Sequence, residues 1–319
     1  MDAAAFATNI RAALSPCSLG IWPTPLEPAP SLARAVGAGI LWLKREDLAG
    51  GNKVRGLEFL LAGAPAGTVF VTVGGTASTH CLATARHARA LGYRAALAQF
   101  PQPVTEVGRA VSDAAAAAAD VVVRADSRIG LPIALWRAWR GARRLGAPRW
   151  VPGGGAHPRA VLGHVLAALE LTTQLGEAPD AIVVPLGTGG TAAGLALGVA
   201  WLGWPTRLIA VRVAPRLVAS EWRTLRLARS AARLLERLGV PFHVPHSAFR
   251  VEVVDGLGAG YGHPSPAGER ARALAADHGL SLDPTYGAKT FAFLVERATL
   301  KDAAGNMKRV VFWHTFARP

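Results

Sequence analysis

A glycine-rich run, Gly187-Thr188-Gly189-Gly190-Thr191, lies between a short apolar segment and a segment rich in alanine. The apolar residues 182–184 predict a buried parallel strand, and residues 192–201 predict a helix. The first N–H groups of a helix have no partner within it and lie at its positive end, so a glycine turn at this place favours an anion such as phosphate. The spacing fits neither the Walker pattern nor the dinucleotide fingerprint, and a tight turn that binds nothing is the alternative.

Lys53 is a second residue that could take part in chemistry. Lysine is rare in this chain, whereas arginine is abundant. Lys53 follows Gly50-Gly-Asn52 at an expected helix start, where the positive end of the helix and burial both lower the pKa of an amine. A deprotonated amine can form a Schiff base with an aldehyde. The alternative is a surface lysine beside a helix cap.

The elements that position these residues alternate along the chain, which predicts an α/β fold with a mainly parallel sheet covered by helices on both faces. Strands are expected near residues 39–44, 68–73, 94–99, 121–125, 181–185, 208–213 and 310–314. Helices are expected near residues 53–62, 78–91, 104–119 and 128–145. With 319 residues, the chain is long enough for two α/β units with a ligand between them.

A phosphate loop and a lone amine together suit pyridoxal 5'-phosphate, which brings a phosphate for the loop and an aldehyde for the lysine. The sequence resembles the fold-type-II pyridoxal phosphate enzymes, the group similar to tryptophan synthase β. Within that group it is most similar to the branch of D-cysteine desulfhydrase and 1-aminocyclopropane-1-carboxylate deaminase. From about residue 20 to the end, the matching motifs appear in the family's order: Pro23-Thr-Pro-Leu-Glu27, Lys44-Arg-Glu-Asp-Leu48, Gly50-Gly-Asn-Lys-Val-Arg55, Leu57-Glu-Phe59, Gly74-Gly75 with Ser78, Pro152-Gly-Gly154, Gly187 to Thr191, Tyr261-Gly262, and Leu282-Asp-Pro-Thr-Tyr286 with Lys289.

The resemblance implies a role for each matching residue. Lys53 corresponds to the lysine that holds the cofactor and later moves protons on the substrate. Ser78 corresponds to the serine at a helix start that receives the substrate carboxylate, and two tyrosines correspond to active-site tyrosines that orient or deprotonate the substrate. A tyrosine near a lysine ammonium is expected to have a depressed pKa and to act as a base; a core aromatic is the alternative. The implied catalytic residues are Lys53, Ser78, Tyr261 and Tyr286, and the implied cofactor-binding residues are Lys53, Asn52, Thr79, Gly187, Thr188, Gly189, Gly190 and Thr191.

The resemblance also implies two domains, each with a mainly parallel twisted sheet flanked by helices. Residues 1–54 and 156–319 are expected to form the larger, cofactor-binding domain, and residues 55–155 the smaller one. A homodimer is implied as well.

The chain departs from the family pattern at places close to the cofactor. Thr79 stands where relatives have an asparagine that hydrogen-bonds the cofactor's phenolic oxygen. Gly287 stands where relatives supply a side chain to the pyridine nitrogen, so the ring is expected to be a weaker electron sink. Phe316 stands where relatives leave the backbone bare, and the loop between Leu48 and Asn52 is shorter than in the desulfhydrases.

Composition excludes several other classes of function. The formal charge is +14, but arginine is scattered through alanine-rich segments without aromatic interleaving, so specific nucleic-acid binding is not expected. Cys17 and Cys81 are too few for a disulfide framework or a four-ligand metal site. His243 and His246 are separated by a proline, so no metal site is expected there. No membrane span and no secretory leader are recognised, which predicts a cytoplasmic protein.

Three functions agree with this pattern. The first is a lyase or deaminase that acts on a small amino acid resembling D-cysteine or 1-aminocyclopropane-1-carboxylate, by elimination or ring opening, and releases a 2-oxo acid and ammonia. The second is a β-replacement enzyme of the same fold. The third is a binding or regulatory protein that keeps the fold without turnover.

Overall fold

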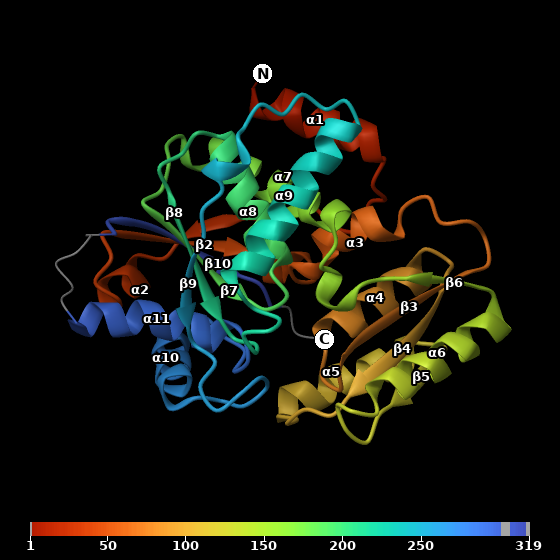
Figure 1. Cartoon of the computed structure of the whole chain (residues 1–319). Helices are drawn as coiled ribbons and strands as arrows, with labels where there is room; N and C mark the ends of the chain where they lie inside the picture. The colour runs from red at the N-terminus through yellow and green to blue at the C-terminus, as the bar shows by residue number, and fades with distance from the viewer. Residues whose placement is uncertain (1, 301–306, 317–319) are drawn as a thin grey trace.

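Two separate sheets organise the chain in the computed structural model, which describes residues 2–300 and 307–316 (Figure 1). The larger sheet has the order β1-β2-β10-β7-β8-β9, and only β1 is antiparallel to its neighbour. Its strands are β1 (Leu26–Pro28), β2 (Ile40–Arg45), β10 (Arg309–His314), β7 (Ala181–Leu186), β8 (Arg207–Arg212) and β9 (Glu252–Asp255). The smaller sheet is wholly parallel in the order β5 (Val121–Arg124), β4 (Arg94–Phe100), β3 (Thr68–Gly75) and β6 (Ala147–Trp150).

Helices cover both faces of each sheet. On the larger sheet, α2, α10 and α11 pack on one face, and α7 and α8 pack on the other, with α1 and α9 outside them (Figure 1). On the smaller sheet, α3, α4 and α5 pack on one face and α6 on the other. Their bounds are α1 Ala3–Leu14, α2 Pro30–Ala35, α3 Lys53–Leu61, α4 Thr79–Ala90, α5 Glu106–Ala118, α6 Leu131–Leu145, α7 Pro158–Leu175, α8 Gly190–Trp201, α9 Glu221–Arg237, α10 Pro266–Asp277 and α11 Gly287–Leu300, with short 3-10 turns η1 Glu46–Ala49, η2 Gly153–Gly155 and η3 His246–Ala248.

The α/β class and the alternation of strands and helices are confirmed, because every element expected from the sequence is present within a few residues of its expected bounds. Three short strands were not expected: β1, β6 and β9. Strand β6 contains Pro148, which cannot donate to a strand ladder, and such a strand is tolerated at a sheet edge, where β6 lies beside β3 alone.

The chain leaves the larger unit after β2 and returns to it before β7, so the smaller unit is an insertion between these strands. Helix α3 connects the two units: Phe59 packs in the core under α7 and α8, whereas Leu57, Leu60 and Leu61 pack in the core of the smaller unit. We propose the boundaries 1–54 with 156–319 and 55–155 for the two domains.

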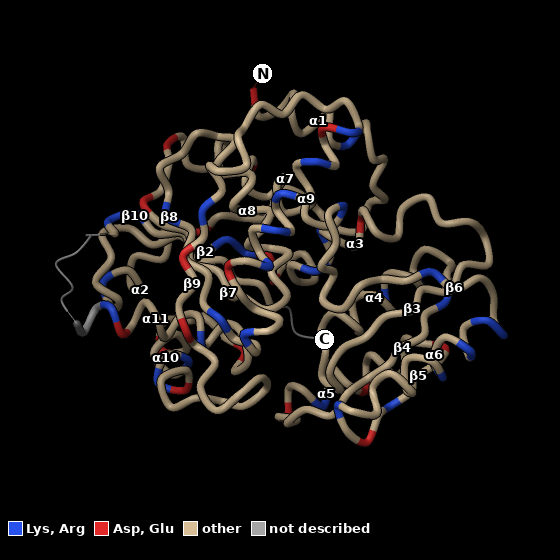
Figure 2. Tube along the Cα trace, viewed as in Figure 1, with Lys and Arg blue, Asp and Glu red and all other residues tan. Residues whose placement is uncertain are grey.

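Two surface properties are visible in the described part of the chain. Lys and Arg are distributed over many elements of both units and do not form one stripe in the view of Figure 2. Among these residues, no helix combines the length and the apolar character that a membrane crossing requires.

Helices α3 and α7 approach closely because Gly163 lies at their contact. A Cβ atom at this position would lie 2.2 Å from the backbone oxygen of Arg55, so any side chain would push the two helices apart. The contact fixes the place of α3, whose first residue is Lys53.

Replacing Gly163 with alanine should therefore lower the free energy of unfolding by about 1–3 kcal/mol, the usual cost of overpacking. Urea denaturation followed by circular dichroism would measure it. Gly130→Ala is the matched control, since its neighbours lie no closer than 3.6 Å, and it should change stability by less than about 1 kcal/mol. Equal effects of the two substitutions would contradict this account of the contact.

Candidate active site

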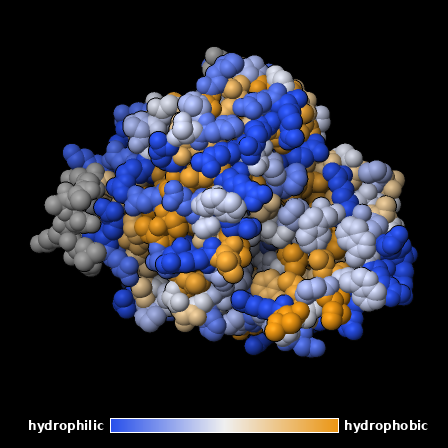
Figure 3. Space-filling view, viewed as in Figure 1, coloured by the Kyte–Doolittle hydropathy of each residue, from blue (hydrophilic) through white to orange (hydrophobic). Residues whose placement is uncertain are grey.

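A cavity of about 490 Å³ lies between the two units, at the carboxyl ends of strands β3, β7 and β10. This is the usual place for a ligand in parallel α/β sheets. The space-filling view of Figure 3 is hollowed near its centre, where the two units meet. The cavity brings together all the residues that the sequence indicated as site residues: Asn52, Lys53, Ser78, Thr79, Gly187, Thr188, Gly189, Gly190, Thr191, Tyr261 and Tyr286.

The glycine-rich turn forms an anion cradle at one end of the cavity. In the described part of the chain, no backbone acceptor receives the N–H groups of residues 187–192, which line the cavity at the start of α8. Gly189 has φ +89°, a left-handed conformation that favours glycine, and a side chain at Gly190 would meet only the carbonyl oxygen of Gly155 at 3.8 Å. Unpartnered N–H groups at a helix start suit a phosphate, so the residues present fit the phosphate of the expected cofactor.

Lys53 lies next to this cradle at the start of α3. Its Nζ donates to the carbonyl oxygen of Gly154 at 3.3 Å. Burial lowers its pKa to about 8, which confirms the expectation of a perturbed amine. The neighbouring Asn52 donates from Nδ2 to Oγ1 of Thr191 at 2.8 Å, so a direct hydrogen bond joins the lysine turn to the glycine-rich turn. An amine that loses its proton near neutral pH is suited to Schiff-base chemistry.

A second set of unpartnered N–H groups lies across the cavity at the start of α4. Ser78 caps this helix, and its Oγ accepts from the N–H of Cys81 at 3.3 Å. Within the described residues, the N–H groups of Thr79 and His80 have no backbone acceptor. Both residues line the cavity, so this helix start can receive a carboxylate.

His80 is a cavity residue that the sequence did not reveal. The hydroxyl of Thr72 donates to the carbonyl oxygen of Val151 at 2.8 Å, so it accepts from Nε2 of His80 at 2.9 Å. Nδ1 is then the unprotonated nitrogen, and this buried atom has no partner among the described residues. Burial, and next the charge of Lys53, lower the pKa of His80 to about 3, and the nearby backbone carbonyl of Pro152 opposes this shift. The ring is therefore a neutral hydrogen-bond acceptor beside the amine.

Tyr261 and Tyr286 form a pair, with 2.6 Å between their hydroxyl oxygens. Burial raises the pKa of both phenols, and for Tyr286 the neighbouring phenol is the next cause. The expectation of a depressed pKa was wrong, because burial is the largest cause for both phenols, and the charge of Arg128, which opposes the rise at Tyr261, contributes less. Asp283 fixes the position of Tyr286 by accepting its N–H at 2.7 Å. At neutral pH both tyrosines are protonated, so they donate hydrogen bonds or protons.

Two of the departures from the family pattern can be located. Gly287 does not line the cavity; its N–H donates to Asp283, and a Cβ atom there would lie 3.0 Å from Oδ2 of that carboxylate. A side chain at this position would require Asp283 to shift by a few tenths of an ångström. The lack of a side chain at Gly287 therefore does not enlarge the cavity. Thr315 and Phe316 do line the cavity, and Phe316 also packs against the core of the smaller unit. Thr315 places a hydroxyl-bearing side chain on the cavity wall that sequence reasoning did not consider.

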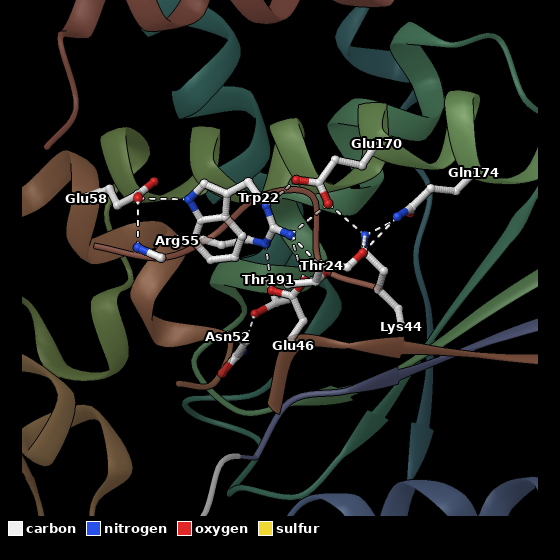
Figure 4. A network of polar contacts seen from close by, with 11 residues as sticks. Trp22, Thr24, Lys44, Glu46, Asn52, Arg55, Glu58, Glu170, Gln174 and Thr191 are labelled. Atoms are coloured by element: carbon white, nitrogen blue, oxygen red, sulfur yellow. Dashed lines mark hydrogen bonds and ion pairs between the residues drawn. The ribbon is translucent and has the colours of Figure 1, made fainter. Parts of the chain in front are cut away.

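A buried ion-pair network surrounds Arg55, which follows Lys53 by two residues in α3 (Figure 4). Arg55, only 2% exposed, donates to both oxygens of Glu46 at 2.6 and 2.8 Å and to both oxygens of Glu170 at 2.8 Å. Lys44 also donates to Glu170, at 2.7 Å, and the ring of Trp22 covers the guanidinium at 3.9 Å. These contacts fix the first turn of α3 against β2, η1 and α7. Within the described residues, no group of three or more His, Cys, Asp or Glu has a metal-binding arrangement.

Comparison with known proteins places this geometry in context. The sequence profile of the family described as "Pyridoxal-phosphate dependent enzyme" matches residues 17–315. The chain is 32% identical to a putative 1-aminocyclopropane-1-carboxylate deaminase of Pyrococcus horikoshii, over 92% of this chain and 89% of that protein. It is 31% identical to D-cysteine desulfhydrase of Salmonella choleraesuis, covering 93% and 92%.

Two further similarities are informative. The chain is 37% identical to nocardicin C-9' epimerase of Nocardia uniformis, over 92% of this chain and 90% of that protein. A crystal structure of an ACC deaminase homologue superposes with a TM-score of 0.79 at 31% identity, covering 97% of this chain and 94% of the other.

Removal of the Arg55 charge should test the ion-pair network. Arg55→Met should lower the free energy of unfolding by about 3–5 kcal/mol, because Glu46 and Glu170 would remain without their shared partner in a buried place. Arg272→Met is the control: it breaks an exposed pair with Glu269 and should cost less than about 1 kcal/mol. Similar losses in chemical denaturation would contradict a special role for Arg55.

The lowered pKa of Lys53 should appear as a pH dependence of its reactivity. Only the neutral amine attacks an aldehyde, so the rate at which cofactor-free protein attaches pyridoxal phosphate should rise with pH and level off above about 8. Borohydride trapping followed by peptide mapping would measure attachment at residue 53 itself. A rate that still climbs at about pH 10, where an ordinary lysine titrates, would refute the perturbation.

Proposed function

Because the chain belongs to the family of pyridoxal-phosphate-dependent enzymes, we propose that it is a lyase or deaminase that converts an amino acid into a 2-oxo acid and ammonia. One observation carries the proposal: Lys53 shares a cavity with two separate sets of unpartnered N–H groups. The set at residues 187–192 suits the phosphate of the cofactor, and the set at Thr79 and His80 suits the carboxylate of an amino acid. The amine lies in the cavity that holds both sites.

Lys53 is the group that we assign to proton transfer at the substrate α-carbon. The bound cofactor supplies an electron-withdrawing ring that makes this carbon acidic. An amine with a pKa of about 8 is partly neutral near neutral pH, so it can accept the α-proton and can afterwards return it. While the amine is free, its Nζ donates to the carbonyl oxygen of Gly154.

The tyrosine pair is the group that we assign to protonation of the departing atom. One hydroxyl donates to the other across 2.6 Å, which leaves one O–H of the pair free to donate. In a β-elimination the bond from the β-carbon to the leaving group breaks, its electron pair goes to the leaving atom, and this O–H supplies the proton. 1-Aminocyclopropane-1-carboxylate has no α-hydrogen, so in a ring opening Lys53 would instead remove a proton from one ring methylene. The bond from the α-carbon to the other methylene would break with its electron pair left on the α-carbon, and the same O–H would then protonate the freed methylene carbon. Hydrolysis of the carbon–nitrogen double bond of the product then gives the 2-oxo acid and ammonia.

Epimerisation is a second candidate, favoured by the 37% identity with nocardicin C-9' epimerase. Epimerisation also begins with removal of the α-proton, but a proton is then returned to the opposite face of the carbon. A neutral tyrosine pair and a partly neutral lysine provide one proton donor and one proton acceptor in the same cavity. For a substrate with an α-hydrogen, the two candidates differ only after the first proton transfer.

The protein purified with pyridoxal phosphate should show visible absorption from covalently bound cofactor. This absorption should persist in Lys308→Ala, which changes an exposed lysine, and the covalent attachment should be lost in Lys53→Ala. Incubation with D-cysteine, L-cysteine and 1-aminocyclopropane-1-carboxylate should release a 2-oxo acid and ammonia from at least one of them. Covalent absorption that survives in Lys53→Ala would refute the assignment of the amine.

The same incubations in heavy water separate the two candidates. Exchange of the α-hydrogen with inversion and without ammonia would favour epimerisation. Release of ammonia would favour the lyase or deaminase.

A further inference from the structure

One wall of the cavity is a continuous face of α4. The residues of this helix that line the cavity recur at spacings of three and four, so they lie on one side of the helix: Thr79, His80, Leu82, Ala83, Arg86 and His87. The wall begins at the N–H groups that suit a carboxylate, is apolar at Leu82 and Ala83, and continues to Arg86 and His87. From Ser78 to Arg86 the helix rises about 12 Å, at 1.5 Å per residue.

A second arginine of the smaller unit also lines the cavity. Arg128 lines the cavity just before α6, with Phe100 and Leu131. Its guanidinium carbon lies 5.6 Å from the centre of the Phe100 ring. Burial raises the pKa of Tyr261, and the charge of Arg128 is among the causes that oppose this rise, so Arg128 lies within electrostatic reach of the tyrosine pair.

The positive charges of this region have no counterpart in the described protein. No Asp or Glu lines the cavity. The phosphate and the substrate carboxylate are already matched by backbone N–H groups at the starts of α8 and α4. Both arginines are exposed residues that line the cavity, and neither forms an ion pair with a carboxylate of the described residues. A third anionic group of the ligand would give these two arginines a negatively charged partner.

We propose that the outer end of the cavity is a subsite for the substrate side chain, and that Arg86 and Arg128 select α-amino acids whose side chain ends in a carboxylate. The inference rests on the proposed function, because the α-carboxylate is placed at the start of α4. The side chain then runs along Leu82 and Ala83, which offer only apolar contact, toward the two arginines. These residues determine specificity and take no part in the proton transfers.

A pair of amino acids that differ only at the end of the side chain provides the test. 2-Aminoadipate carries a carboxylate where norleucine carries a methyl group, and both enantiomers of each are used. Binding to the protein loaded with pyridoxal phosphate is measured by calorimetry, which does not depend on turnover. One enantiomer of 2-aminoadipate should bind about tenfold more tightly than the matching norleucine, as one charge-assisted contact is worth about 1.4 kcal/mol.

The variants identify the residues responsible. Arg86→Met and Arg128→Met should each reduce the preference for 2-aminoadipate at least threefold, and the double variant should abolish it. Arg143→Met, which changes an exposed arginine outside the cavity, is the control and should keep the full preference. Equal affinity for the two amino acids, no binding of either, or a preference that persists in the double variant would overturn the proposal.

Failure of the proposed function gives a different result. In that case Lys53→Ala keeps the covalently bound cofactor, whatever the side-chain preference is. A selective wild type with no covalent attachment at Lys53 would refute the proposed chemistry and retain the subsite.

Discussion

The guanidinium of Arg55 is the contact on which the placement of Lys53 depends. It is bound by Glu46 and Glu170 at once, and these carboxylates come from η1 and α7. A buried ion pair contributes little net stability, because desolvation costs about as much as the attraction returns. Its value is geometric: the fork of the guanidinium accepts only one arrangement of these elements. The amine two residues earlier in the chain is thereby fixed in the cavity.

Where its chemistry is proposed, the cavity offers an anion chiefly backbone N–H groups. The starts of α8 and α4 offer partial positive charge without a titratable side chain, so the protonation of the inner cavity depends mainly on Lys53. His80 stays neutral because its pKa is about 3, and the tyrosines stay protonated. The inner cavity can therefore hold two anionic groups while only one nearby group changes its charge near neutral pH.

The sequence predicted those features that are encoded within one short stretch of chain. The glycine-rich turn and the Lys53 turn are each contiguous, and the main strands are apolar runs because helices cover both of their faces. The resemblance also predicted that these turns share one site, but individual contacts between distant stretches were not predicted. The role of His80 depends on the direction of the Thr72 hydroxyl, and the pKa of Tyr261 depends on its burial against Tyr286. The contact of Gly287 with Asp283, outside the cavity lining, was not predicted either.

The place of β10 determines when this protein can become functional during its synthesis. β10 follows every other strand in the chain, yet it lies between β2 and β7 and pairs with both. Until residues 309–314 have emerged from the ribosome, the larger sheet consists of two fragments with no common ladder. The carbonyl oxygen of Thr315 receives the N–H of Asn52, so the turn that carries Lys53 is also completed by this segment. A nascent chain that is released before this point would lack the central strand of the larger sheet and also the hydrogen bond that holds the Lys53 turn. The neighbouring strands β2 and β7 would then be exposed as unpaired sheet edges.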